Sequence, residues 1–371
     1  MTALSILIKP ASSSCNLRCK YCFYHSLSKN RSVECYGMMS ENTLENIVKK
    51  SLLESEPECT FAFQGGEPTL VGLDFYKKLM ELEKKHNIKN IKINNCIQTN
   101  SILINEEWAI FLHDNNFLVG LSLDGPKDIN DLNRIDIDGK GTYNRIMKSI
   151  AIMNKHKVEY NVLSVVTSSV ARHGKKIYDF YKKNGFKYFQ FIQCLDPLNE
   201  PFGSNKYSLT PEMYGQFLND IFDKWYEDVL KGDFVDIRYF SNLISMIAGN
   251  RPEACGMSGI CSCEFVMEAD GGVYPCDFYV IDEWRMGNIN DMNIRDLFYS
   301  EAAQNFIKVS TNINDKCREC KWFNICRGGC RRHREPIVNG VPSINYFCKS
   351  YEMFFEKSYD RLLMLSKKHF F

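Results

Sequence analysis

The first 195 residues alternate between short apolar runs and stretches of helical periodicity, and this alternation constrains the fold more than any other feature. The apolar runs are rich in branched and aromatic residues and predict six strands, at 4–10, 59–64, 90–98, 117–123, 159–166 and 187–193. Helical segments lie between them, at 40–55, 74–86, 105–115 and 174–185. Repeated β-α units form parallel sheets, so we predict an α/β fold, a partial (β/α)6 TIM-like barrel.

Polar and glycine residues collect directly after these predicted strands. They lie at 64–67, 98–100, 124–125 and 196–197. In parallel barrels the carboxyl ends of the strands carry the chemistry. We therefore expect the active site at this end of the sheet.

The texture of the sequence changes near residue 250. Two helices are predicted before it, at 211–232 and 240–249, and after it come short turns, glycines and nine cysteines between Cys255 and Cys348. We predict a barrel with connecting helices over 1–250, a cysteine-rich domain over 251–350 and an amphipathic packing helix over 351–371.

Charge and hydropathy argue against nucleic acid or a membrane as partner. The chain has 46 Lys and Arg against 45 Asp and Glu, a balance that gives no broad attraction to phosphate backbones or anionic lipid. Its N-terminus lacks a basic stretch followed by a long apolar one, and no segment approaches about 18 uninterrupted apolar residues. We expect a cytoplasmic protein of 371 residues with a substantial core.

Sixteen cysteines are many for a chain of this size. Because the cytoplasm is reducing, disulfides are not expected there, and binding of metal or iron–sulfur clusters becomes the leading explanation.

Three of these cysteines, Cys15, Cys19 and Cys22, form a CxxxCxxC motif after the first predicted strand. In a helix they would share one face, as a stripe of small core residues. The neighbouring Ser12–Ser14 and Asn16 favour a loop instead. A disulfide uses two thiols and a structural zinc site four, whereas three thiolates on a four-iron cluster leave one iron open to a substrate or cofactor.

This motif, followed by "FQGGEP", closely resembles radical S-adenosylmethionine enzymes. The resemblance implies that the open iron chelates S-adenosylmethionine, whose reductive cleavage gives a 5′-deoxyadenosyl radical that abstracts hydrogen. It also implies a set of residues that contact S-adenosylmethionine: Tyr21, Gly65, Gly66, Glu67, Ser122, Arg134 and Leu195. Taken singly, Ser122 also fits the polar face of a strand, Arg134 a solvated surface charge and Leu195 a core residue.

The stretch "CRECKWFNICRGGC" and Cys348 supply a second cysteine pattern, which by its spacing alone also fits a zinc ribbon. Joined to the radical-enzyme motifs, it resembles the SPASM type of extension with two auxiliary clusters, which makes three 4Fe-4S clusters in all. The resemblance implies one ligand set of Cys255, Cys261, Cys276 and Cys330 and another of Cys317, Cys320, Cys326 and Cys348. We interpret the other five as buried hydrophobes, although Cys263 lies close enough to Cys261 to be mistaken for the ligand: Cys35, Cys59, Cys96, Cys194 and Cys263.

The likeness is closest to anaerobic sulfatase-maturating enzymes of the cysteine type, on "LIKPASSSCNLRCKYCFYHSLS", "FAFQGGEPTL", "LSLDGP", "QFIQCLDPL" and "VYPCDFYV". These enzymes oxidise a cysteine, and sometimes a serine, of a sulfatase to formylglycine. The resemblance implies two partners: a nascent or unfolded sulfatase polypeptide with a Cys-x-Pro/Ala-x-Arg motif, and an electron donor such as flavodoxin or ferredoxin. It makes Asp277, which directly follows Cys276, the catalytic proton acceptor, while an ordinary turn aspartate beside Pro275 is the alternative. At the mouth of the barrel, we expect Tyr24 and Gln64 to hydrogen-bond with the substrate as substrate-binding residues. One departure is Ser101, where related sequences tend to have glycine.

Two alternatives stay open. Another peptide-modifying radical enzyme would form thioether or carbon–carbon crosslinks; many of these carry a leader-binding domain in front, whereas only 14 residues precede Cys15. A zinc-binding interaction module would explain the cysteines but not the barrel motifs.

Overall fold

The computed structural model describes residues 3–367. The chain divides into two compact units. The first comprises residues 1–122, 134–160 and 263–306, and the second comprises residues 123–133, 161–262 and 307–371. The predicted domain boundary near residue 250 stays a prediction.

A parallel sheet forms the centre of the first unit. It runs from β8 (Val266–Met267) through β1 (Leu4–Ile8), β2 (Glu58–Phe63) and β3 (Lys92–Thr99) to β4 (Leu118–Ser122). Beyond β8, the short strands β9 (Gly272–Tyr274) and β10 (Gly287–Asn288) continue it antiparallel. Ile8 pairs with Phe63 on one side and Met267 on the other, so the ends of β1, β2 and β8 are level.

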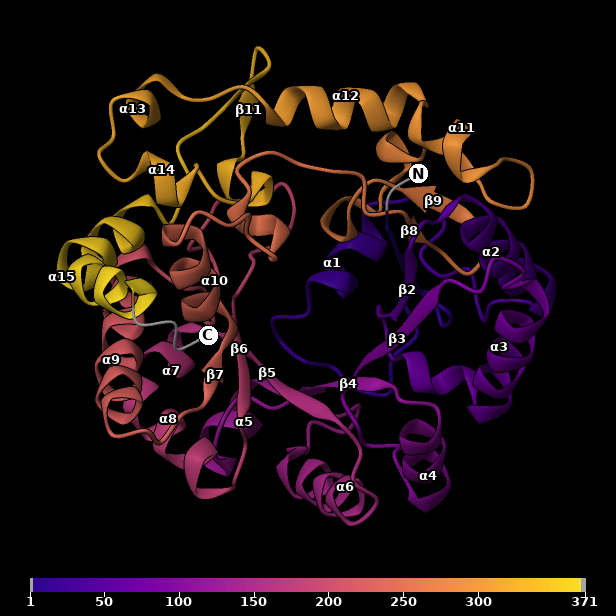
Figure 1. Cartoon of the computed structure of the whole chain (residues 1–371), viewed down its shortest axis with the longest axis horizontal. Coiled ribbons are helices and arrows are strands. Elements are labelled where there is room, and N and C mark those ends of the chain that lie inside the picture. Colours follow the sequence, from indigo (N-terminus) through magenta and orange to yellow (C-terminus); the bar gives the residue numbers. More distant parts are fainter. Residues whose placement is uncertain (1–2, 368–371) are drawn as a thin grey trace. The chain divides into compact units, whose positions relative to one another are not determined.

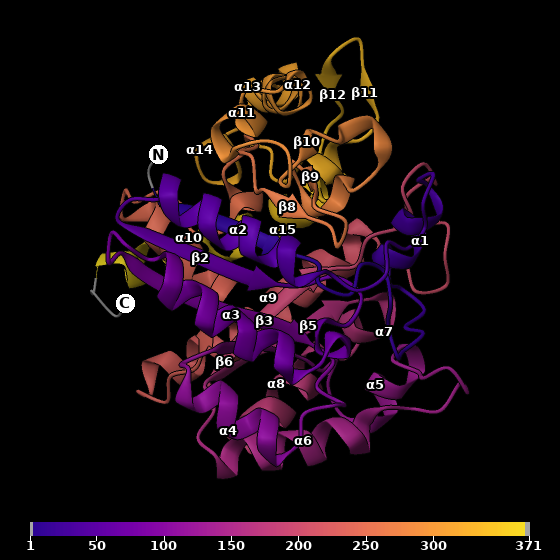
Figure 2. The ribbon, with the colours of Figure 1, turned by 90° about the vertical axis from the view of Figure 1, so that its right-hand side faces the viewer.

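Helices of the first unit follow its strands: α1 (Phe23–Lys29), α2 (Glu41–Glu54), α3 (Leu73–His86), α4 (Glu106–Asp114) and α6 (Tyr143–Lys155). Helix α2 begins where the Ser40 hydroxyl accepts a hydrogen bond from the amide of Thr43. Strand β2 alternates between buried Cys59, Phe61 and Phe63 and half-buried residues of the other face. Figure 2 shows α2 and α3 alongside β2 and β3.

The second unit contains the parallel strands β5 (Tyr160–Val166), β6 (Tyr188–Gln193) and β7 (Asp236–Ile237). Its longer helices are α5 (Lys127–Asn133), α8 (Gly174–Lys183), α9 (Pro211–Leu230), α10 (Arg238–Ile247) and α15 (Cys348–Lys367), with a single turn at α7 (Ser168–Ala171). Helix α15 packs on α9 and α10 (Figure 1). Helix α15 includes residues 351–367 of the predicted packing helix over 351–371, while residues 368–371 lie outside the described part. That prediction, like the other domain bounds, stays a prediction.

Short elements occupy the cysteine-rich stretch. They are η2 (Cys255–Met257), η3 (Asp277–Tyr279), η4 (Asp282–Trp284), α11 (Ile294–Phe298), α12 (Glu301–Ser310), α13 (Asp315–Arg318), α14 (Phe323–Cys326), η5 (Arg331–Arg334) and the hairpin of β11 (Ile337–Val338) and β12 (Val341–Pro342). Between β2 and α3 a further turn, η1 (Pro68–Val71), follows the Gly65–Glu67 loop.

The six predicted strands all form, each within two residues of its predicted bounds. The two-residue strand β7, which lies between two predicted helices, was not predicted because so short a segment has no periodicity. Among residues 3–367, no helix is long and apolar enough to cross a membrane.

Candidate active site

The three-cysteine motif lies in a loop between β1 and α1, as predicted, and Cys22 is the N-cap of α1. The alternative of a helical core stripe is wrong, because residues 10–22 form turns and one isolated bridge. The amide of Leu17 donates to Cys15 Sγ at 3.4 Å. Burial, and to a smaller extent the charges of Glu67, Cys22 and Cys19, raises the pKa of Cys15 to about 12. Cys15 therefore lies within electrostatic range of Cys19 and Cys22, although within residues 3–367 no three His, Cys, Asp or Glu side chains are arranged as a metal-binding group.

The Gly65–Gly66–Glu67 loop after β2 packs directly on this cysteine loop. The amide of Glu67 donates to the carbonyl oxygen of Ser14 at 2.8 Å. Gly66 has a φ of 56°, and a Cβ there would lie 2.3 Å from the same oxygen. Only glycine fits at this position, because any side chain would separate the two loops.

The Glu67 carboxylate joins the loops that follow β2 and β3. Its Oε1 accepts hydrogen bonds from the Thr69 amide (3.1 Å), the Thr69 hydroxyl (2.6 Å) and the Thr99 hydroxyl (2.7 Å), and its Oε2 accepts one from the Asn100 amide (2.8 Å). Burial raises its pKa. Three of these four hydrogen bonds occupy Oε1 and hold the two loops together. Oε2 accepts only one, so it is the oxygen that can still accept a hydrogen bond from the ammonium group of a ligand.

Three further residues predicted to contact S-adenosylmethionine lie in the first unit. Ser122 ends β4 and accepts a hydrogen bond from Gln98 Nε2 at 3.1 Å. The guanidinium of Arg134 lies 5.6 Å from the ring centroid of Tyr21, and its Nη1 lies 4.0 Å from Cys19 Sγ. Because Arg134 is buried, its interpretation as a solvated surface charge is wrong. Leu195 follows β6 in the second unit and is buried, which also fits its alternative interpretation as a core residue. Its contact with S-adenosylmethionine stays a prediction.

Ser101 has a left-handed backbone with a φ of 62°. It is fully buried, and its hydroxyl has no hydrogen-bond partner among the described residues. A glycine would adopt this conformation without strain, which gives a physical reason for the residue expected in relatives.

Tyr24, Gln64 and Asp277 form one hydrogen-bonded group, the Tyr24–Gln64–Asp277 group. They come from α1, the end of β2 and η3. The Tyr24 hydroxyl donates to Asp277 Oδ2 at 2.5 Å, and Gln64 Nε2 donates to the Tyr24 hydroxyl at 2.7 Å and to Asp277 Oδ2 at 3.1 Å. The structure thus brings together the three residues predicted to handle the substrate.

The two carboxylate oxygens of Asp277 differ in their surroundings. Oδ2 accepts both hydrogen bonds, whereas buried Oδ1 has no hydrogen-bond partner within residues 3–367. Burial raises the pKa of Asp277, and burial next to this carboxylate raises that of Tyr24 well above its usual value. Oδ1 is therefore the carboxylate oxygen that these hydrogen bonds leave unused, and the role of Asp277 as proton acceptor stays a prediction.

The predicted auxiliary ligands form two sets. Cys317, Cys320, Cys326 and Cys348 all belong to the second unit. Burial, followed by the charges of Cys348, Cys317 and Cys320, raises the pKa of Cys326 to about 12, and their role as one ligand set stays a prediction.

In the other set, burial and the charge of Cys261 raise the pKa of Cys330 to about 11. A Cβ on Gly256, next to Cys255, would lie 3.7 Å from Cys330 Cβ. Cys276 belongs to the first unit, so this set draws on both units and stays a prediction.

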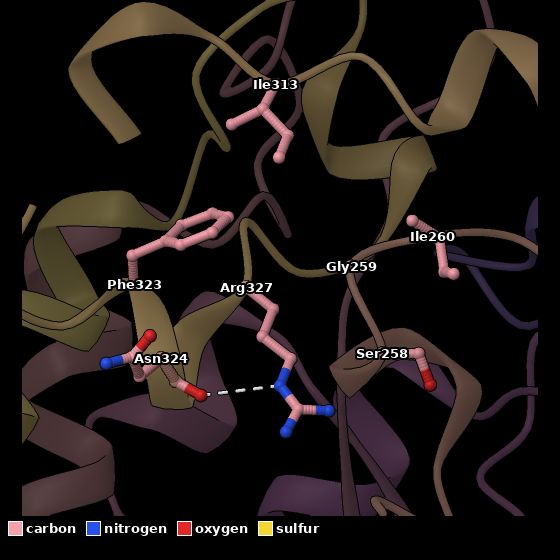
Figure 3. A pocket seen from close by; sticks show the side chains of 7 residues that line it. All are labelled: Ser258, Gly259, Ile260, Ile313, Phe323, Asn324 and Arg327. Atoms are coloured by element: carbon pink, nitrogen blue, oxygen red, sulfur yellow. Dashed lines mark hydrogen bonds between the residues drawn. The ribbon is translucent and has the colours of Figure 1, made fainter. Parts of the chain in front are cut away.

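A pocket of about 310 Å³ lies in the second unit beside these ligand loops (Figure 3). Gly259 makes the loops pack tightly, because a Cβ there would lie 2.1 Å from the carbonyl oxygen of Arg327. The Arg327 Nε donates to the carbonyl oxygen of Asn324 at 3.3 Å. The segment before Cys261 and the end of α14 at Cys326 thus pack against each other beside this pocket. The pocket is lined by Ser258, Gly259, Ile260, Ile313, Phe323, Asn324 and Arg327.

The five cysteines outside the predicted ligand sets differ in their burial. Cys59 and Cys194 are buried as predicted, and Cys96 and Cys263 are half-buried. The prediction is wrong for Cys35, which is exposed in the loop after α1, with its thiol 3.3 Å from the Ser14 hydroxyl.

Lys9 is a site residue that sequence reasoning missed. Its Nζ lies 4.9 Å from the ring centroid of Tyr24. The available signal was a basic residue that closes an apolar strand in "LSILIKP".

Comparisons with known proteins agree with this geometry. The Radical SAM superfamily matches residues 10–180, and the SPASM iron-sulfur cluster-binding domain matches residues 259–321. A cysteine-type anaerobic sulfatase-maturating enzyme of Clostridium perfringens is 53% identical over 98% of this chain and 98% of its own. This chain belongs to the anaerobic sulfatase-maturating enzymes. The enzyme is also 33% identical to a serine-type member of Bacteroides thetaiotaomicron, over 95% of this chain and 89% of that one.

A solved structure, native anSMEcpe with bound AdoMet and Cp18Cys peptide, aligns with a TM-score of 0.95. It is 51% identical and the alignment covers 99% of both chains. The predicted fold class, a radical S-adenosylmethionine α/β domain with a SPASM domain, is confirmed.

The predicted cofactors, S-adenosylmethionine and three 4Fe-4S clusters, are those of the family. The zinc-module alternative is wrong, and the 53% identity favours sulfatase maturation over peptide crosslinking.

Proposed function

We propose that this enzyme oxidises a cysteine of a sulfatase polypeptide to formylglycine. The observation that carries the proposal is the Tyr24–Gln64–Asp277 group, which lies in the same unit as the three-thiol loop and starts two residues after Cys22. The substrate is a nascent or unfolded chain with a Cys-x-Pro/Ala-x-Arg motif. Flavodoxin or ferredoxin supplies electrons in the cytoplasm.

Cys15, Cys19 and Cys22 would hold the cluster that binds S-adenosylmethionine, and together these groups supply the radical chemistry that removes a hydrogen atom from the substrate Cβ. The chemistry of these ligands fits this role, because three thiolates leave one iron of a four-iron cluster free. Around the bound cofactor, Gly66 allows close backbone approach and Arg134 holds the Tyr21 ring.

Asp277 takes the thiol proton of the substrate on Oδ1, while Tyr24 and Gln64 hold Oδ2 and so fix the carboxylate. Removal of one hydrogen atom, one proton and one electron leaves the substrate carbon doubly bonded to sulfur. Water then replaces the sulfur, which leaves as hydrogen sulfide, and the aldehyde results. The eight thiolates of the auxiliary sets cover two clusters fully, which suits electron transfer.

The test is an anaerobic incubation of the enzyme with S-adenosylmethionine, reductant and a peptide that contains Cys-x-Pro-x-Arg. We expect an aldehyde at the cysteine position, detected by mass spectrometry and by hydrazide capture. The same peptide with alanine for cysteine is the control, and a serine peptide measures the specificity. A crosslinked product, or cofactor cleavage that leaves the cysteine peptide untouched, would overturn the proposal.

A further inference from the structure

In the sheet, Lys9 lies between Gln64, which follows β2, and Glu268, which follows β8. Ile8 is paired with Phe63 of β2 and Met267 of β8, so the next residues along these strands are Lys9, Gln64 and Glu268. Two hydrogen bonds fix this row, from the Gln64 amide to the Ile8 carbonyl at 2.9 Å and from the Lys9 amide to the Met267 carbonyl at 2.8 Å. Adjacent positions in parallel strands lie about 4.8 Å apart, so Lys9 is a direct neighbour of both.

The Lys9 ammonium belongs to a buried charge cluster, the Lys9–Glu268–Arg31 cluster. Lys9 Nζ lies 2.9 Å and Arg31 Nη1 lies 2.7 Å from Glu268 Oε1, and all three side chains are almost completely buried. Although burial raises the pKa of Glu268, the two cations lower it to about 2. Two cations against one anion leave a surplus positive charge in a place with little solvent, and such a charge needs further partners. The buried Asp277 carboxylate is one of them, because Lys9 also acts on it electrostatically.

The Tyr24 ring is one such partner, with its centroid 4.9 Å from Lys9 Nζ. The negative face of an aromatic ring attracts a desolvated cation strongly. The aliphatic stem of Lys9 is itself fixed against Gly65, where a Cβ would lie 2.6 Å from Lys9 Cε. The hydroxyl of the same tyrosine donates to Asp277 Oδ2.

We propose that Lys9 is a positioning residue for the reaction: its ammonium, held by Glu268, fixes the Tyr24 ring and thereby the hydroxyl that orients Asp277. This inference rests on the proposed function. Within residues 3–367, Lys9 contacts Glu268, Tyr24 and Gly65 but no predicted cluster ligand, so we expect its effect on the substrate steps and not on cluster assembly.

The experiment compares Lys9→Met with the unsubstituted enzyme for iron content, 5′-deoxyadenosine formed and aldehyde formed from the Cys-x-Pro-x-Arg peptide. Glu268 keeps Arg31 as its partner in this variant. We expect unchanged iron and 5′-deoxyadenosine, with the aldehyde formed per 5′-deoxyadenosine reduced about tenfold. Lys9→Arg keeps a cation over the ring and should restore this ratio.

Lys50→Met is the matched control. This lysine lies in the same unit, and its ammonium donates to the carbonyl oxygens of Ile289 at 2.6 Å and Met292 at 3.0 Å, away from the Tyr24–Gln64–Asp277 group. Its loss should leave the aldehyde ratio unchanged. In a Tyr24→Leu background, Lys9→Met should reduce the ratio less than it does in the unsubstituted enzyme, because both substitutions remove the contact between the ammonium and the ring.

Several results would overturn the role of Lys9 alone: an unchanged ratio in Lys9→Met, loss of iron in both Lys9 variants, or an additive effect in the Tyr24→Leu background. Failure of the unsubstituted enzyme to form aldehyde is a separate outcome. It would overturn the proposed function and this role with it.

Discussion

Hydrogen bonds to one carboxylate oxygen orient the side chain of Asp277, and in the proposed reaction the other oxygen accepts the substrate proton. Tyr24 and Gln64 both donate to Oδ2, while Oδ1 is buried with no hydrogen-bond partner in the described part of the chain. An unpartnered buried oxygen is costly in a folded protein, and a bound substrate that donates to Oδ1 would remove this cost. An asparagine in this place keeps the acceptor for Tyr24 and Gln64 but cannot take up a proton.

We therefore expect Asp277→Asn to keep the clusters and the cleavage of S-adenosylmethionine and to lose about 100-fold or more of aldehyde formation. The measurement is aldehyde and 5′-deoxyadenosine from the same anaerobic reaction. Asp282→Asn is the control, because this nearby carboxylate accepts from the Ser32 amide and is no part of the site. Full aldehyde formation in Asp277→Asn would remove Asp277 from the catalytic role.

Cys261 and Cys263 are two residues apart but have different surroundings. Cys261 belongs to the second unit and acts electrostatically on Cys330, whereas Cys263 belongs to the first and its thiol lies 3.7 Å from Met286 Sδ. We expect Cys261→Ala to lose about four irons per chain and Cys263→Ala to lose none, measured by iron analysis after anaerobic reconstitution. The opposite pattern would exchange the two assignments.

Among the elements, helix α3 carries a carboxylate, that of Glu83, whose charged form is destabilised by burial. Glu83 faces β3, where Asn95 Nδ2 donates to its Oε2 at 3.2 Å, and its Oε1 has no hydrogen-bond partner among residues 3–367. Burial raises the pKa of Glu83 from 4.5 to about 7. As the pH rises from 4.5 to 7 the unfolded chain releases this proton and the folded chain retains it, so stability is lost over this range.

Glu83→Gln should remove that loss. At pH 8 we expect the variant to be more stable than the unsubstituted protein, by at most about 3 kcal/mol, and near pH 5 the difference should be small. Thermal unfolding under anaerobic conditions at both pH values measures this. Glu81→Gln on the same helix, whose exposed carboxylate pairs with Lys78, should show no such pH dependence. Equal melting temperatures of the Glu83→Gln variant and the unsubstituted protein at pH 8 would contradict the burial argument.

Strands and motif loops could be predicted from the sequence because their signals are local. The apolar runs predicted strands β1 to β6, and the serines beside Cys15 predicted the loop that carries the three cysteines. What stayed hidden depends on register between distant segments: β8 places Glu268 next to Lys9, and η3 places Asp277 against Tyr24. Recognition of motifs supplied Asp277, but no local pattern indicates that Lys9 is buried.

At the scale of the whole molecule, the predicted cluster ligands are distributed unequally over the two units. Cys15, Cys19 and Cys22 lie in the first unit, and Cys317, Cys320, Cys326 and Cys348 lie in the second. The loop that carries Cys15 is held by contacts within its own unit, from the Leu17 amide to Cys15 Sγ and from the Glu67 amide to the Ser14 carbonyl oxygen. The two corresponding clusters should therefore assemble independently of each other.

Iron analysis of reconstituted protein tests this independence. The unsubstituted enzyme should bind about twelve irons per chain, for three clusters of four. Replacement of Cys15, Cys19 and Cys22 by alanine should leave about eight and abolish cleavage of S-adenosylmethionine. Replacement of Cys317 and Cys320 should also leave about eight but preserve that cleavage, because the three-thiol loop keeps its own partners. Loss of more than about four irons in either variant would show that one cluster is needed to build another.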